Sequence, residues 1–472
     1  MKTIQIFLYI AIVSFLVSCS EKKMDFVNQD RNDAADVPTV NILPDAELVT
    51  AFEVNGTDIA WYATVYIEHS AGTWAQSWDA DQRQAQNASS LFNNSWVFIY
   101  QGMNECNVIL QKTDPVSGSE PTNYWARGIA YVLMAYDLAY ATDMWGEVPW
   151  TEALKGAGNP QPKYDKQSFI YSELQRLLDS AINILPKTIS TAPANDYIYG
   201  GDQNLWIKAA WSLKARYHLR LSQRDPDAYA KALQDIPSGF ASNADNFLFN
   251  VYTTAASGQN PWFQFLQDRT HLSAGQTLYD LMNERNDPRI PAYFTQVDGA
   301  YVPAPDGAAL QTQGGVYSTS LITLNGETAP TPLMTYHELK FIEAEAKFKS
   351  GDATWQTSLA EAIAANFDWH GVSGADTYFT DDVLPRLTEG NELNEIITQK
   401  YIALYEFEAT EAYNDYRRVG IPTMHNPNNV TVGFVWRFPY ALSEVSSNPS
   451  NVPNVNIFVD KVWWSGGNEL VP

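Results

Sequence analysis

The chain has 472 residues, of which 45% are hydrophobic and 18% charged, enough apolar side chains for one large core or two ordinary ones. Its formal net charge of −24 opposes binding of nucleic acid, anionic lipid headgroups and polyanionic ligands unless a local basic patch intervenes. Aromatic residues make up 13%, including 15 tryptophans and 26 tyrosines. That surplus exceeds what a core requires and favours an aromatic surface on which a ligand can stack.

The first residues have the pattern of an export signal. Lys2 supplies a positive charge, and Ile4 to Val17 is an apolar stretch too short to span a bilayer comfortably. Leu-Val-Ser-Cys at positions 16–19 fits the bacterial lipobox. Residues 1–18 are therefore predicted to be a lipoprotein signal peptide, with lipid on Cys19 as the membrane anchor. The alternative is a secreted protein with a chance cysteine at this position.

Lipid on Cys19 would leave Cys106 without a partner, because the chain has only 2 cysteines. The exported domain then has no intrachain disulfide, and Cys106 is interpreted as a small buried hydrophobe. The polar residues that follow the lipobox favour a flexible tether over residues 19–40. A single domain is predicted over residues 41–472.

Helical patterns dominate this domain. Pro44 is placed in the first turn of a helical segment that reaches roughly His69. Further on, apolar side chains recur at three- and four-residue steps, and the segments resemble the helix–turn–helix units of tetratricopeptide repeats without a strict period. The predicted helices are Leu91 to Leu110, Tyr124 to Asp143, Phe169 to Leu185, one from about Trp206 to Leu221, a pair from His337 with its turn at Gly351, and a last pair from about Asn391.

Between about residues 225 and 332 the composition shifts to Gly, Pro, Ser, Asn and aromatic residues. Long irregular segments of this kind inside a compact domain are usually functional loops. Helix pairs occur on both sides of this insertion, so one intertwined domain is favoured over two.

Motifs for common catalytic chemistry are absent from the sequence, which has no P-loop, dinucleotide-binding turn, nucleophile elbow or H-E-x-x-H zinc motif. Paired carboxylates could serve a glycosidase, but with 54 acidic residues chance pairs are plentiful. The pairs Glu343/Glu345, Glu406/Glu408 and Asp79/Asp81 are interpreted as solvated or salt-bridged. A structural calcium ion at Asp79 and Asp81, or at Asp298 and Asp306, lacks the spacing of an EF-hand. No catalytic residue, cofactor or metal is predicted.

Three motifs in a fixed order carry a resemblance. Asp143 to Trp150 reads DMWGEVPW, Ile397 to Pro422 reads ITQKYIALYEFEATEAYNDYRRVGIP, and Arg437 to Pro449 reads RFPYALSEVSSNP. Together with the lipobox they resemble the SusD/RagB family of Bacteroidetes outer-membrane lipoproteins, closest to its SusD-like branch. The resemblance runs from Cys19 to about Pro449.

This resemblance implies a mainly α fold, in which four tetratricopeptide-like helix pairs form a scaffold and long irregular loops hold the ligand. It also implies a binding protein rather than an enzyme, one that captures oligosaccharide on the cell surface and delivers it to a TonB-dependent outer-membrane transporter of the SusC type.

The motifs themselves are interpreted as scaffold. Gly146 is expected to end an apolar helix, Pro149 to force Val148 out of helical geometry, and Trp145 and Trp150 to pack the turn. Arg417 and Arg418 are expected to pair with acidic residues of neighbouring helices.

Sugars present apolar C–H faces and hydroxyl rims, so a site needs flat aromatic rings beside polar side chains. The segment after His69 meets this need, with tryptophans predicted to stand on a turn. In the family, an early loop after the first helix contributes tryptophans to the ligand platform. The predicted ligand residues here are Trp74, Gln76, Trp78, Asp81 and Arg83, the alternative being that one tryptophan covers the core.

A second group lies in the central insertion, the region from which family members usually complete the platform. It comprises Trp262, Phe263, Tyr301 and Tyr317, for which core packing and ligand stacking are equally favoured; Trp436 is a weaker candidate. The aromatic loops hold only Arg83 and Arg269 as cations, which favours a neutral or weakly charged oligosaccharide.

Three alternatives remain open. The protein could be an importer lid for peptides or another nutrient, a surface glycosidase, or a purely structural envelope lipoprotein. A sugar ring stacked on Trp74 or Trp78 would distinguish a glycan-binding protein from an importer lid for another nutrient. Unchanged ligand affinity after replacement of both tryptophans would indicate a purely structural role, and release of reducing sugar would identify a glycosidase.

Overall fold

The computed structural model describes residues 36–187, 195–429 and 432–471. The signal peptide, Cys19 and most of the tether lie outside the described residues. Helix α3 (Thr39–Leu48) begins inside the segment assigned to the tether, and Thr39 is fully buried. Pro44 lies inside α3 rather than in its first turn, and a π-helix, η1 (Val49–Asn55), and α4 (Asp58–Tyr66) follow.

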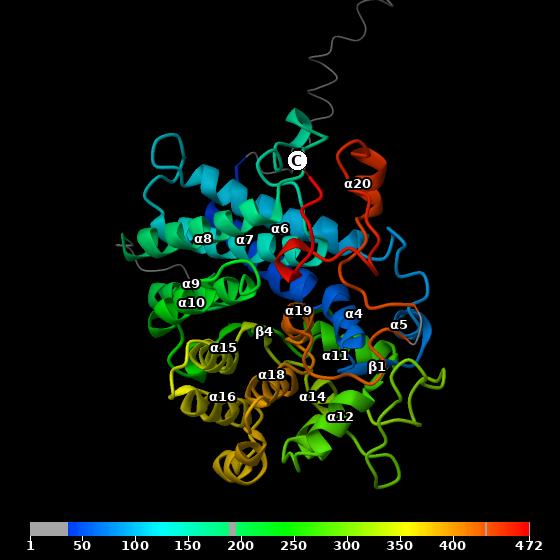
Figure 1. Cartoon of the computed structure of the whole chain (residues 1–472). Helices are drawn as coiled ribbons and strands as arrows, with labels where there is room; N and C mark the ends of the chain where they lie inside the picture. The colour runs from blue at the N-terminus through cyan, green and yellow to red at the C-terminus, as the bar shows by residue number, and fades with distance from the viewer. Residues whose placement is uncertain (1–35, 188–194, 430–431, 472) are drawn as a thin grey trace, which may run out of the picture.

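A scaffold of helix pairs forms most of the molecule, as predicted. In Figure 1 the pairs are stacked along one side, with α6, α7 and α8 above α9 and α10, and α15, α16 and α18 below. The pairs are α6 (Asn93–Lys112) with α7 (Tyr124–Trp145), α8 (Gln167–Ile184) with α9 (Gln203–Arg220), α15 (Tyr336–Lys349) with α16 (Trp355–Trp369), and α18 (Glu392–Ala403) with α19 (Ala409–Val419).

The predicted boundaries of these helices are correct to within a few residues, because caps and glycines fix them. Asn123 accepts a hydrogen bond from the Ala126 amide at 3.2 Å to start α7, and Thr335 accepts one from the Glu338 amide at 3.3 Å to start α15. Gly351, after α15, and Gly420, after α19, have positive φ angles of 74° and 70°.

The central insertion is more ordered than its composition suggests. It contains five short α-helices and two short strands, joined by loops and 3-10 turns. These are α10 (Ala228–Asp235), β2 (Phe247–Phe249), α11 (Pro261–Asp268), β3 (Leu272–Ala274), α12 (Gln276–Asn283), α13 (Ile290–Tyr293) and α14 (Leu321–Leu324). Strand β2 pairs antiparallel with β4 (Thr331–Met334), and β3 pairs antiparallel with β1 (Ser70–Gly72). The second of these pairings attaches the insertion to the segment that carries the predicted tryptophans.

The corner after α7 is a buried junction between two of the sequence motifs. Gly146 ends α7 with φ 80°, and Trp145 is fully buried with its indole N–H donating to the Pro439 carbonyl at 2.9 Å. Arg437 donates to the Trp145 carbonyl and lies 3.3 Å from the Glu147 carboxylate. The Phe438 ring meets the Trp145 indole edge-on, with centroids 5.7 Å apart. The scaffold role predicted for this corner matches its geometry.

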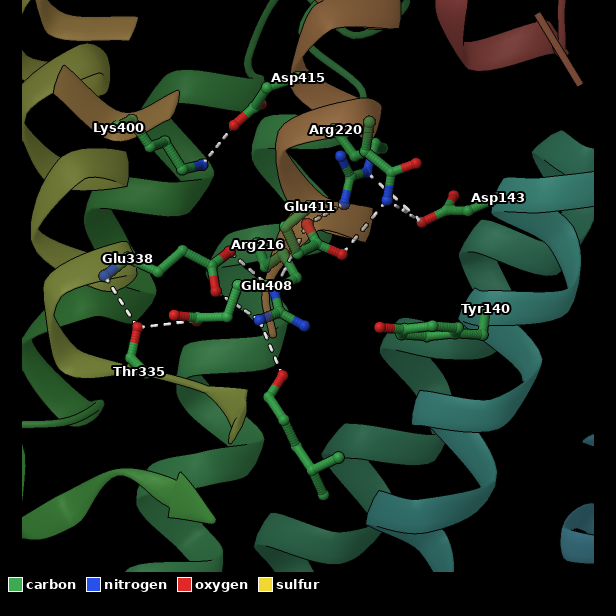
Figure 2. Close-up of polar contacts among 12 residues, drawn as sticks. Tyr140, Asp143, Arg216, Arg220, Thr335, Glu338, Lys400, Glu408, Glu411 and Asp415 are labelled. Carbon is green, nitrogen blue, oxygen red and sulfur yellow. Dashed lines mark hydrogen bonds and ion pairs between the residues drawn. The ribbon is translucent and has the colours of Figure 1, made fainter. Parts of the chain in front are cut away.

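Charged side chains fill the interior between the helix pairs. Arg216 and Arg220 of α9 share the Glu411 carboxylate, Arg216 also pairs with Glu338 of α15, and Arg220 lies 3.5 Å from Asp143 of α7 (Figure 2). Burial alone would raise the pKa of Glu411, but the two guanidinium groups lower it. These ion pairs therefore join α7, α9, α15 and α19 across the core.

A second buried group extends these ion pairs. Lys400 of α18 bonds Asp415 at 2.7 Å, and Arg418 bonds both Asp415 and Glu345. The pairing predicted for Arg418 with acidic residues is therefore confirmed. Arg417 differs, because it donates to the carbonyls of Asp143 and Trp436 and stacks over Tyr413.

Candidate glycan-binding site

The predicted tryptophans lie beside a tight backbone crossing. Strand β1 ends at Gly72, and a Cβ at this position would lie 1.8 Å from the Ser77 carbonyl oxygen, so only glycine fits. The next residues form α5 (Ala75–Asp81), with Trp74 as its N-cap residue in an extended conformation. Trp78 therefore lies within a helix, and the prediction that it stands on a turn is wrong for this residue. The two indoles start one helical turn apart.

A loop of the insertion, residues 304–318, is fastened against α5. The Trp78 indole N–H donates to the Ala309 carbonyl at 3.4 Å, and the Gln82 amide donates to the Gly307 carbonyl at 2.9 Å. In return, the Gly307 amide donates to the Asp81 carboxylate at 2.9 Å. The backbone amide of Thr312 donates to the Thr73 carbonyl at 2.7 Å. Segments about 230 residues apart in the chain thus form one surface, which we call the platform: residues 73–82 together with residues 304–318.

The platform carries partly exposed aromatic and amide side chains. Trp74, Gln76 and Trp78 are all half-buried, neither sealed in the core nor fully free. Tyr317 is also half-buried; it packs on a small cluster of Ala71, Ala304 and Ala309, and its hydroxyl accepts a hydrogen bond from the Leu310 amide at 3.1 Å. Partly exposed aromatic rings beside amide groups suit the apolar faces and hydroxyl rims of sugars.

Two residues predicted at the rim face inward. Asp81 is 3% exposed, and its burial raises its pKa to about 7 despite the nearby Arg83 guanidinium. Arg83 is 5% exposed and stacks over the Tyr66 ring at 5.2 Å, while donating to the carbonyls of Ala80 and Pro427. Both side chains make hydrogen bonds within the fold. Because they are buried, they do not face a ligand on the platform in this conformation.

The insertion candidates divide in the same way. Trp262 is 2% exposed and packs edge-on against Phe407, so it lines the core. Phe263, beside it on α11, is half-buried. Tyr301 is half-buried next to Tyr279, with ring centroids 6.1 Å apart. Trp436 is half-buried, beneath the Lys461 ammonium, which lies 3.9 Å from its ring.

Sequence reasoning missed the loop residues that hold the platform together, namely Gly307, Ala309 and Thr312. All three take part through backbone atoms, so their side chains carry no signal. The one usable sign was the Gly- and Pro-rich composition of the insertion, which marks a functional loop without giving its neighbour.

Comparison with known proteins identifies the family. A family model described as "Starch-binding associating with outer membrane" matches residues 36–440. The chain belongs to the SusD-like family. Among solved structures it is similar to a SusD/RagB family protein from Bacteroides thetaiotaomicron, with 32% identity and a TM-score of 0.84 over 92% of this chain and 100% of the other.

Two further structures share the fold at lower identity. One is described as a chitin-binding protein, with 22% identity and a TM-score of 0.78 over 91% of this chain and 100% of the other. Another is a chitin-binding SusD homolog from Flavobacterium johnsoniae, with 20% identity and a TM-score of 0.74 over 90% of this chain and 97% of the other. A search of curated proteins finds no match.

The acidic pairs of this SusD-like chain are mostly engaged within the fold. Glu345 pairs with Arg418, Glu343 with Lys340 and Lys347, and Glu408 lies 3.0 Å from the His337 ring. Glu406 is buried and accepts a hydrogen bond from Thr323 at 2.6 Å; burial raises its pKa to about 7. In the described residues, no three His, Cys, Asp or Glu side chains are arranged to hold a metal ion. Every helix in that part of the chain is too short or too polar to span a bilayer.

Proposed function

We propose that this SusD-like protein captures oligosaccharide on the platform and delivers it to a SusC-type TonB-dependent transporter in the outer membrane. The lipid on Cys19 anchors the protein at the cell surface. The single observation that carries the proposal is the pair of half-buried indoles at α5: Trp74 is its N-cap residue, and Trp78 within it donates a hydrogen bond to the loop 304–318.

The platform suits a polymer because it is a surface and not a closed pocket. A cavity that adjoins the platform, lined by Gln76, Ser77 and Ala80 together with Trp61, Tyr62 and Phe265, is too small to admit a sugar. A sugar chain would lie across Trp74 and Trp78 with its C–H faces on the rings, while Gln76 and the loop contact its hydroxyls. Tyr317, Tyr301 and Phe263 extend the stacking surface in this proposal.

The charge distribution favours a neutral glycan. The net charge is −24, and of the two arginines in the aromatic loops Arg83 is turned inward, which leaves the exposed Arg269. A sulfated or uronate-rich polymer would approach against this field with one exposed guanidinium in these loops to meet it.

A binding role without catalysis is part of the proposal. The two chitin-binding relatives are described by what they bind. The carboxylates of Glu343, Glu345 and Glu408 already have partners in the fold, whereas a glycosidase needs an acid and a base facing the substrate.

Isothermal titration with matched oligosaccharides tests the binding proposal. We expect binding of a neutral series, starch-type or chitin-type, and loss of at least tenfold in affinity in Trp74→Ala and in Trp78→Ala, as is usual for removal of a stacking ring. Trp211→Ala, which removes an indole from α9 away from the platform, is the matched control. Tight binding of a sulfated glycan or of peptides, with none of neutral oligosaccharides, would overturn the proposal, and reducing-sugar release by the purified protein would point to a glycosidase.

Delivery to the transporter is tested separately. The lipidated protein should co-purify from outer membranes with a TonB-dependent transporter, and replacing Cys19 with alanine should release it from the membrane fraction. Purification without any transporter, under conditions that retain the lipid anchor, would contradict the delivery role.

A further inference from the structure

A second aromatic groove lies outside the platform. It has a volume of about 670 Å³, within the range of small-molecule sites. Residues of α3, η1, α6 and β2, together with the segments around Tyr197 and Gln259, line this groove. None of the lining residues belongs to α5 or to the loop 304–318, so the groove is separate from the platform. A neighbouring cavity of about 410 Å³ shares Asp45 with it and extends it along α3 and α6.

One wall of this groove is a continuous run of aromatic rings. Phe52 lies 6.4 Å from Tyr252, Tyr252 lies 5.2 Å from Phe249, and Phe249 lies 6.4 Å from Tyr197, measured between ring centroids. The Tyr252 hydroxyl is fixed at 2.7 Å from Thr331, so the ring is held in place. Tyr197 is 40% exposed, so the run is open to solvent at that end.

The polar groups of the groove are carboxylates and amides. Asp45 and Glu53 line it together with Gln101 and Gln259, and its lining includes no Lys or Arg. Glu53 lies near Asp58, and burial together with that like charge raises the pKa of Glu53. Neither Asp45 nor Glu53 makes an ion pair with another described residue.

The adjoining cavity repeats this pattern. Burial and the neighbouring Asp45 carboxylate raise the pKa of Glu105 to about 7, and one of its oxygens is buried without a hydrogen-bond partner. Lys112 supplies the cation of this cavity, but it pairs with Asp36. Carboxylates gathered without a counter-charge destabilise one another, and an incoming cation would relieve that repulsion.

We propose that this groove is a second ligand site, which takes a glycan carrying free amino groups. Aromatic rings attract an ammonium group through their π faces, and adjacent carboxylates pair with it. The remaining sugar faces pack on the Phe52–Tyr197 wall. The site is independent of the platform and of the function proposed for it.

A pair of probes that differ only in charge tests this site: the tetramer of glucosamine and the tetramer of N-acetylglucosamine. Binding is measured by isothermal titration at a mildly acidic pH, low enough for the amines of the glucosamine tetramer to be protonated. The protein carries Trp74→Ala and Trp78→Ala, so the platform does not contribute. We expect the glucosamine tetramer to bind at least about tenfold more tightly than the acetylated one, and to weaken as salt is raised.

Point changes locate the binding. Glu53→Gln, Asp45→Asn and Phe52→Leu should each weaken binding of the glucosamine tetramer by about fivefold or more. Glu389→Gln, the same change of charge on an exposed loop before α18, should leave binding unchanged, and thermal unfolding shows that each variant is folded. Equal affinity for the two tetramers, no binding of either, or full affinity in both Glu53→Gln and Asp45→Asn would overturn the proposal.

Discussion

Arg437 enters the corner after α7 and satisfies several groups at once. It is fully buried, donates to the Trp145 carbonyl and the Tyr440 hydroxyl, and faces Glu147. Glu147 in turn accepts a hydrogen bond from the Leu470 amide at 2.7 Å, which ties the C-terminal segment to the same corner. All of these contacts are made by one guanidinium nitrogen, Nη2, while Nε and Nη1 are buried without a hydrogen-bond partner. Glu147 is therefore the group that balances this buried charge.

Replacing Arg437 with alanine should therefore be strongly destabilising. The change leaves Glu147 buried without its cation, and we expect a loss of about 3–5 kcal/mol in the free energy of unfolding, measured by urea denaturation. Arg176→Ala is the matched control, because Arg176 is 53% exposed and pairs with Glu173 on the surface, where the loss should stay below about 1 kcal/mol. A similar small loss in both variants would refute this account of the corner.

Residue-level roles were only partly predictable. Trp145, Gly146 and Arg418 have the roles that their residue types and positions suggest. Arg83 and Asp81 look like rim residues in the sequence, since a polar segment does not show which side chains turn inward. Their partners, Pro427 and Gly307, lie hundreds of residues away and contribute backbone atoms.

At the scale of elements, the platform depends on one close crossing of the backbone. Strand β1 passes the start of α5 at Gly72, and β1 is also paired with β3 of the insertion. The position of α5 therefore fixes the distance between the tryptophans and the loop that faces them.

Gly72→Ala should disturb this crossing. The added Cβ meets backbone atoms that cannot move aside, so we expect about 1–3 kcal/mol of destabilisation together with weaker glycan binding. Gly158→Ala introduces the same methyl group where nothing lies within 4 Å, and it should change neither property. Thermal unfolding and glycan titration of both variants check this. If Gly72→Ala kept the stability and the glycan affinity of the unchanged protein, the close crossing would not be needed for the platform.

The contact between α5 and its loop should also respond to pH through Asp81. Burial raises the pKa of Asp81 to about 7 in the folded protein, against about 4 when unfolded. The folded state thus holds this proton more tightly, and stability from this group is greatest below about pH 4 and falls as the pH rises toward 7.

Asp81→Asn should remove that part of the pH dependence. Relative to the unchanged protein, the variant should gain stability between about pH 4 and pH 7, by on the order of 4 kcal/mol. Urea denaturation across this range measures the difference between the two proteins. A difference that does not vary with pH would show that Asp81 is ionised in the folded state throughout.

Elements were the most predictable level of this structure. Apolar periodicity, caps and glycines located the paired helices, because those signals are local. Helix α5 was missed, since Trp74 to Asp81 is short and reads as a polar turn. The short helices of the insertion were missed for a similar reason: their Gly-, Pro- and Asn-rich surroundings hide runs of only four to eight residues.

For the whole molecule, acidic charge at the surface coexists with a core of paired charges. Arg216, Arg220 and Lys400 each have carboxylate partners on other helices, which joins the stacked pairs into one body (Figure 2). The platform lies on the opposite side from these stacks, around α5 and β1 (Figure 1). The family motifs indicated this division of scaffold and loops, whereas the meeting of residues 73–82 with residues 304–318 needed the three-dimensional structure.

The most direct test of the central claim is a crystal structure with a bound neutral oligosaccharide. Our account predicts a sugar ring stacked on Trp74 or Trp78, with the loop 304–318 contacting its hydroxyl groups. A ligand seated elsewhere, with both indoles uncovered, would contradict it.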